Sequence, residues 1–138
     1  MSVTHFEQPD LADDLPAPGV YPCTVAAAQL SRSGGGNRMV RVVYQLDAVP
    51  VGRERVTEYF VLEGCSERGV AWARRRLVQL YRACGLQPQP GDPISLASLA
   101  GAELQVQVEH ERWQGRDRLR VVDHRPSEEL SEDDRVPF

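Results

Sequence analysis

Residues 39–62 read MVRVVYQLDAVPVGRERVTEYFVL, in which two runs of alternating apolar and polar side chains flank a turn at Pro50–Gly52. A period of two is typical of β-strands that bury one face. The pattern therefore predicts strands over residues 39–46 and 53–62. The core-facing side chains of the first strand are Val40, Val42, Tyr44 and Leu46.

Glu58 interrupts the second strand, because it falls on the same face as Val56 and Phe60. A β-bulge beside Glu58 would turn the carboxylate away from these apolar neighbours. A reversed face assignment would do the same. The alternation alone leaves both explanations open.

Three more strands and one helix continue the pattern. The strands are predicted over residues 20–30, 102–109 and 116–124, with Gln114 and Gly115 as the turn between the last two. A helix is predicted from its cap Ser66 to about Cys84, because apolar residues recur at helical spacing and Gly85 follows as a stop.

The order of these elements predicts the fold. A β-rich chain with one helix between its third and fourth strands matches the OB-fold, a five-stranded Greek-key barrel whose closure removes exposed strand edges. The predicted organisation is a flexible acidic arm over residues 1–18, the barrel domain over residues 19–126 and an acidic tail over residues 127–138.

Charge is divided unevenly along the 138 residues. The net charge is −4, but residues 20–126 hold 15 basic and 11 acidic side chains, a net charge of +4. All 16 basic residues are arginine, which pairs with phosphate and stacks on bases. A GC-rich genome would produce the same bias, so the arginines alone do not decide the function.

Several classes of protein do not fit the sequence. No apolar run approaches the roughly 18 residues of a membrane span, and the acidic amino terminus does not resemble a signal peptide. We therefore expect a cytoplasmic protein of a bacterial or phage-infected cell. Cys23, Cys65 and Cys84 form no paired motif, which predicts small buried apolar residues, and neither a metal nor another cofactor.

Basic and aromatic residues gather where OB-folds bind oligonucleotides, on the second and third strands and on the loops that join strands one to two and four to five. The candidate DNA-binding residues are Arg32, Arg38, Arg41, Arg55, Tyr59, Arg112, Trp113, Arg116 and Arg118. An exposed Trp113 between arginines would stack on bases, although it could instead cap the barrel. Tyr59 could likewise belong to the core.

The predicted helix carries Arg74–Arg76 and a stripe of Arg68, Arg75 and Arg82. Most such stripes are solvated faces, so we do not assign them to a DNA path. Trp72 fits either the exposed face of the helix or the core.

No catalytic motif emerges from the spacing of histidine, cysteine and serine, so an enzyme is not expected. Glu109 and Glu111 lie at strand spacing beside a basic loop, which keeps a small metal-dependent nuclease as an alternative. A protein-interaction adaptor that binds no nucleic acid is a second alternative.

The final residues suggest a docking tip for a protein partner. A terminal phenylalanine offers an aromatic ring and an α-carboxylate together, and the acids before it steer toward a basic pocket. The candidate docking residues are Asp133, Asp134, Val136, Pro137 and Phe138. This tip resembles that of bacterial single-stranded DNA-binding proteins, although Arg135 stands where that tip has an acid.

The body resembles a family of small phage- and prophage-encoded OB-fold proteins. The matching segments are Gly19–Tyr21, Ser33–Asn37, Met39–Val42, Glu58–Leu62, Ala83–Leu86, Leu99–Gly101 and Gly115–Asp123. The resemblance implies sequence-tolerant binding of single-stranded DNA in replication or recombination, with the tail recruiting partner proteins. It leaves the oligomeric state open.

Overall fold

The computed structural model describes residues 15–47 and 55–127 as five strands, one α-helix and one 3-10 turn. The elements are β1 (Gly19–Arg32), β2 (Arg38–Leu46), β3 (Arg55–Val61), α2 (Glu67–Ala83), η1 (Leu96–Ser98), β4 (Glu103–Trp113) and β5 (Arg116–Pro126). The strands form one antiparallel sheet in the order β3-β2-β1-β4-β5. The predictions of a β-rich fold and of a helix between the third and fourth strands are confirmed.

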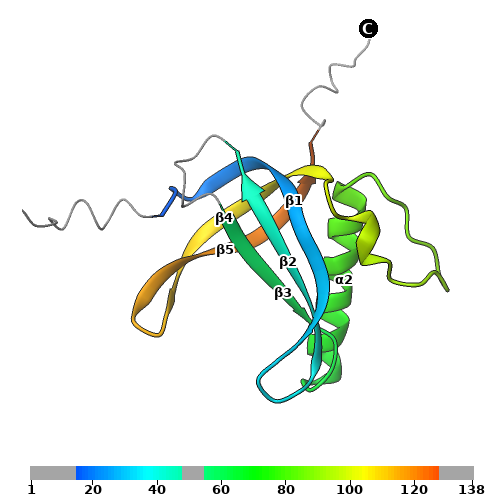
Figure 1. The fold of residues 1–138 in the computed structure, drawn as a ribbon. Coiled ribbons are helices and arrows are strands. Elements are labelled where there is room, and N and C mark those ends of the chain that lie inside the picture. Colours follow the sequence, from blue (N-terminus) through cyan, green and yellow to red (C-terminus); the bar gives the residue numbers. More distant parts are fainter. Residues whose placement is uncertain (1–14, 48–54, 128–138) are drawn as a thin grey trace, which may run out of the picture.

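The sheet curves strongly, and α2 stands along one side of it (Figure 1). The predicted apolar face of β2 is buried, including Val40 and Tyr44. Register shifts bend β1 at Val25–Ala27 and β4 at Gln107–Val108. The core lies inside this curve, where Leu104 and Val106 of β4 pack against the side chains of β2 and α2.

The helix begins where the sequence predicts. The Ser66 side chain accepts a hydrogen bond from the backbone N–H of Gly69 at 3.1 Å, which satisfies one of the free donors of the first turn. Gly85 follows the last turn with φ of +87°, a conformation that favours glycine. The face of α2 that carries Leu77 and Leu80 is buried against the sheet.

The predicted closure of the barrel is wrong for the described residues. β3 and β5, the two edges of the sheet, approach each other but share no backbone ladder between residues 55–61 and 116–126. The sheet is therefore open along this seam. Side chains join the two edges in place of the missing backbone hydrogen bonds.

Glu58 is the centre of this side-chain network. Its carboxylate is buried on the core face of β3, where it accepts hydrogen bonds from Tyr44 Oη at 2.7 Å and His124 Nε2 at 2.8 Å, and pairs with Arg76. The other ring nitrogen of His124 lies 2.6 Å from Gln79 Oε1. The β2–β3 register is continuous, so neither a bulge nor a reversed face explains Glu58. Instead, polar partners satisfy its charge.

Arg76 ties the helix to both edges of the seam. Besides Glu58 on β3, its guanidinium donates to the carbonyl oxygens of Val121 at 3.2 Å and Val122 at 3.4 Å on β5. These carbonyls belong to an edge strand. The helix thus supplies hydrogen bonds where a closed barrel would use a neighbouring strand.

The cysteines occupy three different environments. Cys23 is buried, and burial raises its pKa to about 12. Cys84 is half-buried against the core, and burial raises its pKa to about 11. Cys65 is exposed in the bend before α2, so the prediction that it is buried is wrong.

Some sequence predictions lie outside the described residues. These are the turn at Pro50–Gly52, most of the arm and all of the tail after Ser127. Leu15, the first described residue, packs against the core. The carbonyl oxygen of the next residue, Pro16, lies 2.7 Å from His110 Nε2. Among the described residues, no helix has the length and apolar content needed to cross a membrane.

Arg76→Ala should lower the free energy of unfolding by about 3 kcal/mol, because it leaves the buried Glu58 carboxylate without its charged partner. The matched control is Arg75→Ala, whose side chain is exposed one position earlier on α2. This control should leave stability nearly unchanged. Urea unfolding followed by circular dichroism measures both variants, and equal effects would contradict the bridging role of Arg76.

Candidate nucleic-acid interface

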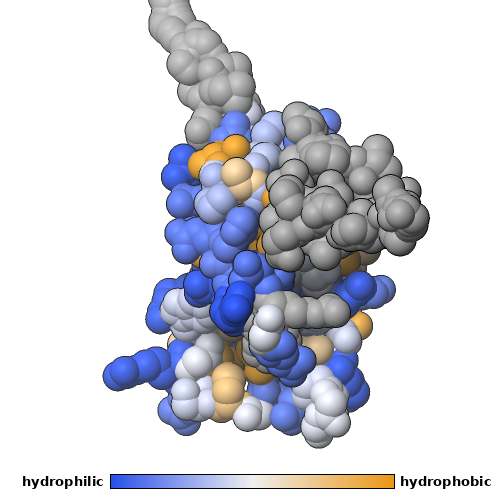
Figure 2. Space-filling model, turned by 90° about the vertical axis from the view of Figure 1, so that its left-hand side faces the viewer, coloured by the Kyte–Doolittle hydropathy of each residue, from blue (hydrophilic) through white to orange (hydrophobic). Residues whose placement is uncertain are grey.

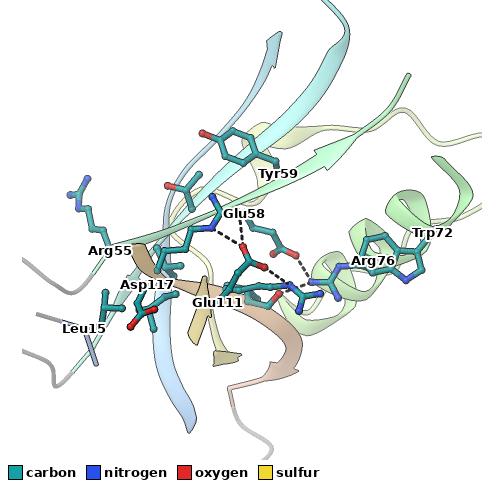
Figure 3. Close-up of a pocket in the computed structure, with 14 residues that line it drawn as sticks. Leu15, Arg55, Glu58, Tyr59, Trp72, Arg76, Glu111 and Asp117 are labelled. Carbon is teal, nitrogen blue, oxygen red and sulfur yellow. Dashed lines mark hydrogen bonds and ion pairs between the residues drawn. The ribbon is translucent and has the colours of Figure 1, made fainter. Parts of the chain in front are cut away.

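The open seam between β3 and β5 is a groove of about 750 Å³ (Figure 3). Its walls come from both edge strands, and its far end is formed by Trp72 and Arg76 of α2. The lining residues are Leu15, Arg55, Val56, Thr57, Glu58, Tyr59, Trp72, Arg76, Glu111, Asp117, Arg118, Leu119, Arg120 and Val121. The groove therefore combines apolar, aromatic and strongly charged groups.

Two aromatic side chains stand exposed at this groove. Tyr59 on β3 is 51% exposed and Trp72 on α2 is 52% exposed. Tyr59 is thus not a core residue, whereas Tyr44, one strand away, is fully buried. Open ring faces of this kind are surfaces on which flat ligands can stack.

Two arginines lie on the same outer face of the sheet as Tyr59. Arg41 on β2 lies directly opposite Tyr59 in the β2–β3 register. Arg55 lies opposite Gln45 and donates to its side-chain oxygen at 3.5 Å. Among the described residues, no ion pair engages Arg41 or Arg55, so both charges are available to an anion.

The arginines of β4 and β5 whose side chains the structure describes are held by carboxylates. Arg118 donates to Glu111 Oε2, with Nη2 at 2.6 Å and Nε at 2.7 Å, while Arg120 Nε lies 3.5 Å from the other oxygen of Glu111. Arg112 pairs with Asp117 at 2.9 Å. Glu111 thus lies between two arginines, in a position that a phosphate could take.

The β1–β2 loop is placed apart from this groove. Figure 1 shows that loop at the bottom of the molecule and the β4–β5 hairpin at the left. Arg32 donates to the Gly36 carbonyl oxygen at 2.7 Å, and Arg38 pairs with Glu63 at 3.4 Å. These two predicted residues are not brought together with Arg55, which lies at the other end of the β2–β3 pair.

The β4–β5 hairpin turns through Gln114 and Gly115, as the sequence predicts. Their φ angles of +51° and +79° are those of a two-residue turn with both central residues left-handed. Trp113 and Arg116 are backbone partners on either side of this turn. Their side chains lie outside the described part of the structure, so the stacking role predicted for Trp113 stays a prediction.

The face of the molecule on the hairpin side is mainly hydrophilic, with small and scattered apolar areas among the coloured atoms (Figure 2). Such a face suits a polar or charged ligand better than a membrane or an apolar partner. The helix stripe of Arg68, Arg75 and Arg82 is exposed, as expected of a solvated face.

The neighbours of Glu58, at the floor of the groove, and of Tyr44 fix the protonation states of both side chains. Burial raises the pKa of Glu58, but hydrogen bonds and charge from His124 and Arg76 outweigh burial and hold that pKa below its ordinary value. Burial and the adjacent Glu58 carboxylate raise the pKa of Tyr44 well above its ordinary range. Glu58 is therefore an anion and Tyr44 a hydrogen-bond donor at neutral pH.

The groove contains residues that the sequence analysis did not assign to the site, chiefly Trp72, Arg76 and Arg120. One signal was available for Arg76, since it lies three residues after Ala73 and four before Leu80 on the buried face of the helix. A charged residue at such a position calls for a buried partner. The identity of that partner, Glu58, could not be obtained from spacing.

The described residues contain no group of three or more His, Cys, Asp or Glu side chains arranged to hold a metal ion. Of the acidic pair considered for a nuclease, Glu111 is engaged by Arg118 and Arg120 and Glu109 is exposed on the same strand. Comparison of the chain with models of protein families and with curated proteins finds no match.

The fold should lose stability as the pH falls below about 4.5, because ionised Glu58 is preferred in the folded state. A lowered folded pKa gives stability that is present above the ordinary value of 4.5 and lost as the pH falls through the folded pKa. Urea unfolding of the wild type and of Glu58→Gln, repeated from pH 7 to pH 3, measures how the free energy of unfolding changes with pH. The free energies of unfolding of the two proteins should differ less toward acid pH. A difference that stays constant with pH would contradict the assignment of Glu58 as an anion in the fold.

Proposed function

We propose that this protein binds single-stranded DNA in the β3–β5 groove and on the adjoining outer face of β2 and β3. The observation that carries the proposal is the juxtaposition of Tyr59 and Trp72 with arginines from both edge strands around one open groove. Single strands bind through stacking of unpaired bases and through cations along the backbone. This groove offers both kinds of contact.

The charge of the body supports the same proposal. Residues 20–126 carry a net charge of +4, although the whole chain carries −4. Arg41 and Arg55 have no ion pair with the described residues. Arg41 lies opposite Tyr59, and Arg55 lies four residues before Tyr59 on the same face of β3. Stacking depends little on base identity, so we propose binding that tolerates many sequences.

We further propose that the sheet is an OB-type barrel, in which the β3–β5 seam is bridged by side chains. The strand order, the antiparallel pairing and the position of α2 before β4 are compatible with that fold. In OB-folds, strands two and three carry the ligand-binding face. The proposed site includes those strands here.

The acidic tail is proposed to recruit proteins of DNA replication or recombination. This part of the proposal depends on the sequence of residues 127–138 alone, with Asp133, Asp134 and the terminal Val136-Pro137-Phe138 as the docking residues. A terminal ring and carboxylate fit an apolar pocket beside a cation.

Titration with oligo-dT should quench tryptophan fluorescence, and the binding constant should fall steeply with salt because arginines displace counterions from the phosphates. Arg55→Ala should weaken binding because it removes an available cation. Tyr59→Ala should weaken it by about tenfold or more, since one stacked base contributes about 1 to 3 kcal/mol. Tyr59→Phe keeps the ring and should retain most of the affinity.

The matched control for Arg55→Ala is Arg82→Ala, which removes the same charge from the exposed stripe of α2. Equal losses from the two substitutions would contradict a site in the groove. Absence of salt-sensitive binding at low ionic strength would overturn the proposed function and favour the adaptor. A parallel titration with oligo-U compares DNA with RNA, and degradation of labelled strands with Mg²⁺ or Mn²⁺ would favour the nuclease.

Removing residues 128–138 should leave DNA affinity unchanged or increase it, because the removed segment contains five acidic residues and one arginine. Fluorescence titration with oligo-dT compares the full chain with the shortened chain, and a loss of affinity would contradict the assignment of the tail to protein partners.

Docking is tested with an immobilised peptide of residues 128–138 and a matched peptide that lacks Phe138. Only the peptide that ends in Phe138 should retain replication proteins.

A further inference from the structure

Trp72 is the largest exposed aromatic side chain in the described part of the structure whose role the sequence analysis left undecided. It lies in the first half of α2 and lines the groove, with 52% of its surface exposed. A single exposed apolar residue is common on protein surfaces and is not evidence of a site. The way in which this ring is held supplies the further evidence.

The indole ring is fixed on one side by a cation that is itself fixed. The guanidinium carbon of Arg76 lies 5.0 Å from the centroid of the Trp72 ring. Arg76 is held in turn by Glu58 and by the carbonyl oxygens of Val121 and Val122. The ring therefore rests on the network that joins the two edges of the sheet.

About half of the surface of Trp72 is exposed, and the residue lines the groove at the helix. Arg76 lies over the ring and contacts only part of it, so that the exposed part of the side chain can contact a ligand. A ring held in place before binding loses little side-chain entropy when a flat ligand stacks on it. Trp72 is thus a preorganised surface.

Tyr59 provides a second ring on the β3 wall of the groove. Figure 3 shows Tyr59 on β3 and Trp72 on α2 at two sides of the groove, with Glu58 and Arg76 between them. Arg55 and Arg120 also line the groove. Two separated aromatic surfaces with cations beside them suit two bases of one strand and the phosphates between them.

From this arrangement we infer that Trp72 is a base-stacking platform, and that the bound strand runs through the β3–β5 groove to the helix. This inference rests on the proposed function and names a residue outside the β2–β3 face and the hairpin loops. It places stacking on a helical residue and not only on the β4–β5 hairpin that carries Trp113.

Two single-tryptophan variants separate the two possible platforms. Trp113→Phe leaves Trp72 as the only tryptophan, and Trp72→Phe leaves Trp113. In titrations with oligo-dT at low salt, the emission of Trp72 in the Trp113→Phe variant should be strongly quenched. Trp72→Ala should lower affinity by about tenfold or more, whereas Trp72→Phe, which keeps a ring, should retain most of it.

Controls distinguish stacking from damage to the fold. Ile94→Ala removes an apolar side chain that is 43% exposed and lies outside the groove, so it should leave affinity unchanged. Urea unfolding of Trp72→Ala shows whether the Arg76 network is preserved. If Trp72→Ala is destabilised, two measurements still test the inference. They are the quenching of Trp72 in the Trp113→Phe protein and the affinity of Trp72→Phe for oligo-dT.

The outcomes separate this inference from the proposed function. Salt-sensitive binding by the wild type, with no quenching of Trp72 and equal affinity of Trp72→Ala, would overturn the inference and leave the proposed function standing. Absence of binding by the wild type would overturn both. The inference would be supported if Trp72 fluorescence is quenched, Trp72→Ala loses affinity for oligo-dT and Trp72→Phe retains most of that affinity.

Discussion

The structure depends on the buried carboxylate of Glu58. This one group accepts hydrogen bonds from Tyr44 on β2, His124 on β5 and Arg76 on α2. The three donors come from three elements, of which the backbone ladder of β3 reaches only β2. Because a buried charge is tolerated only when it is paired and hydrogen-bonded, each donor is needed in its place. The carboxylate thereby fixes the position of the helix relative to both edges of the sheet.

Joining the edges by side chains has a structural effect that a backbone ladder would not have. Strands in a ladder lie about 4.8 Å apart and leave no room between them. Here the seam between β3 and β5 is a groove, with Glu58 and Arg76 at its floor and Tyr59 and Trp72 at its sides. The same network that holds the fold together therefore shapes the candidate site and fixes one of its aromatic rings.

The sequence predicted the elements well and their long-range polar contacts poorly. Strand alternation and the Ser66 cap are local signals, and they located the strands, the helix and the exposed position of Arg55, but they left the position of Tyr59 open. The partners of Glu58 lie at sequence separations of 14, 18 and 66 residues, so no periodicity connects them, and closure by backbone pairing was expected instead. The loop arginines were assigned from fold analogy, but Arg32 and Arg38 are engaged by Gly36 and Glu63, which do not line the groove.

The carboxylate of Glu111 between Arg118 and Arg120 has a consequence for the ionic character of this surface. A phosphate that takes Arg118 from Glu111 exchanges one anion for another, and the freed carboxylate must then be solvated or neutralised. Such a contact displaces fewer counterions than a contact with an unpaired arginine. The salt dependence of polyanion binding should therefore depend more on Arg41 and Arg55, which have no ion pair with the described residues, than on the total number of arginines around the groove.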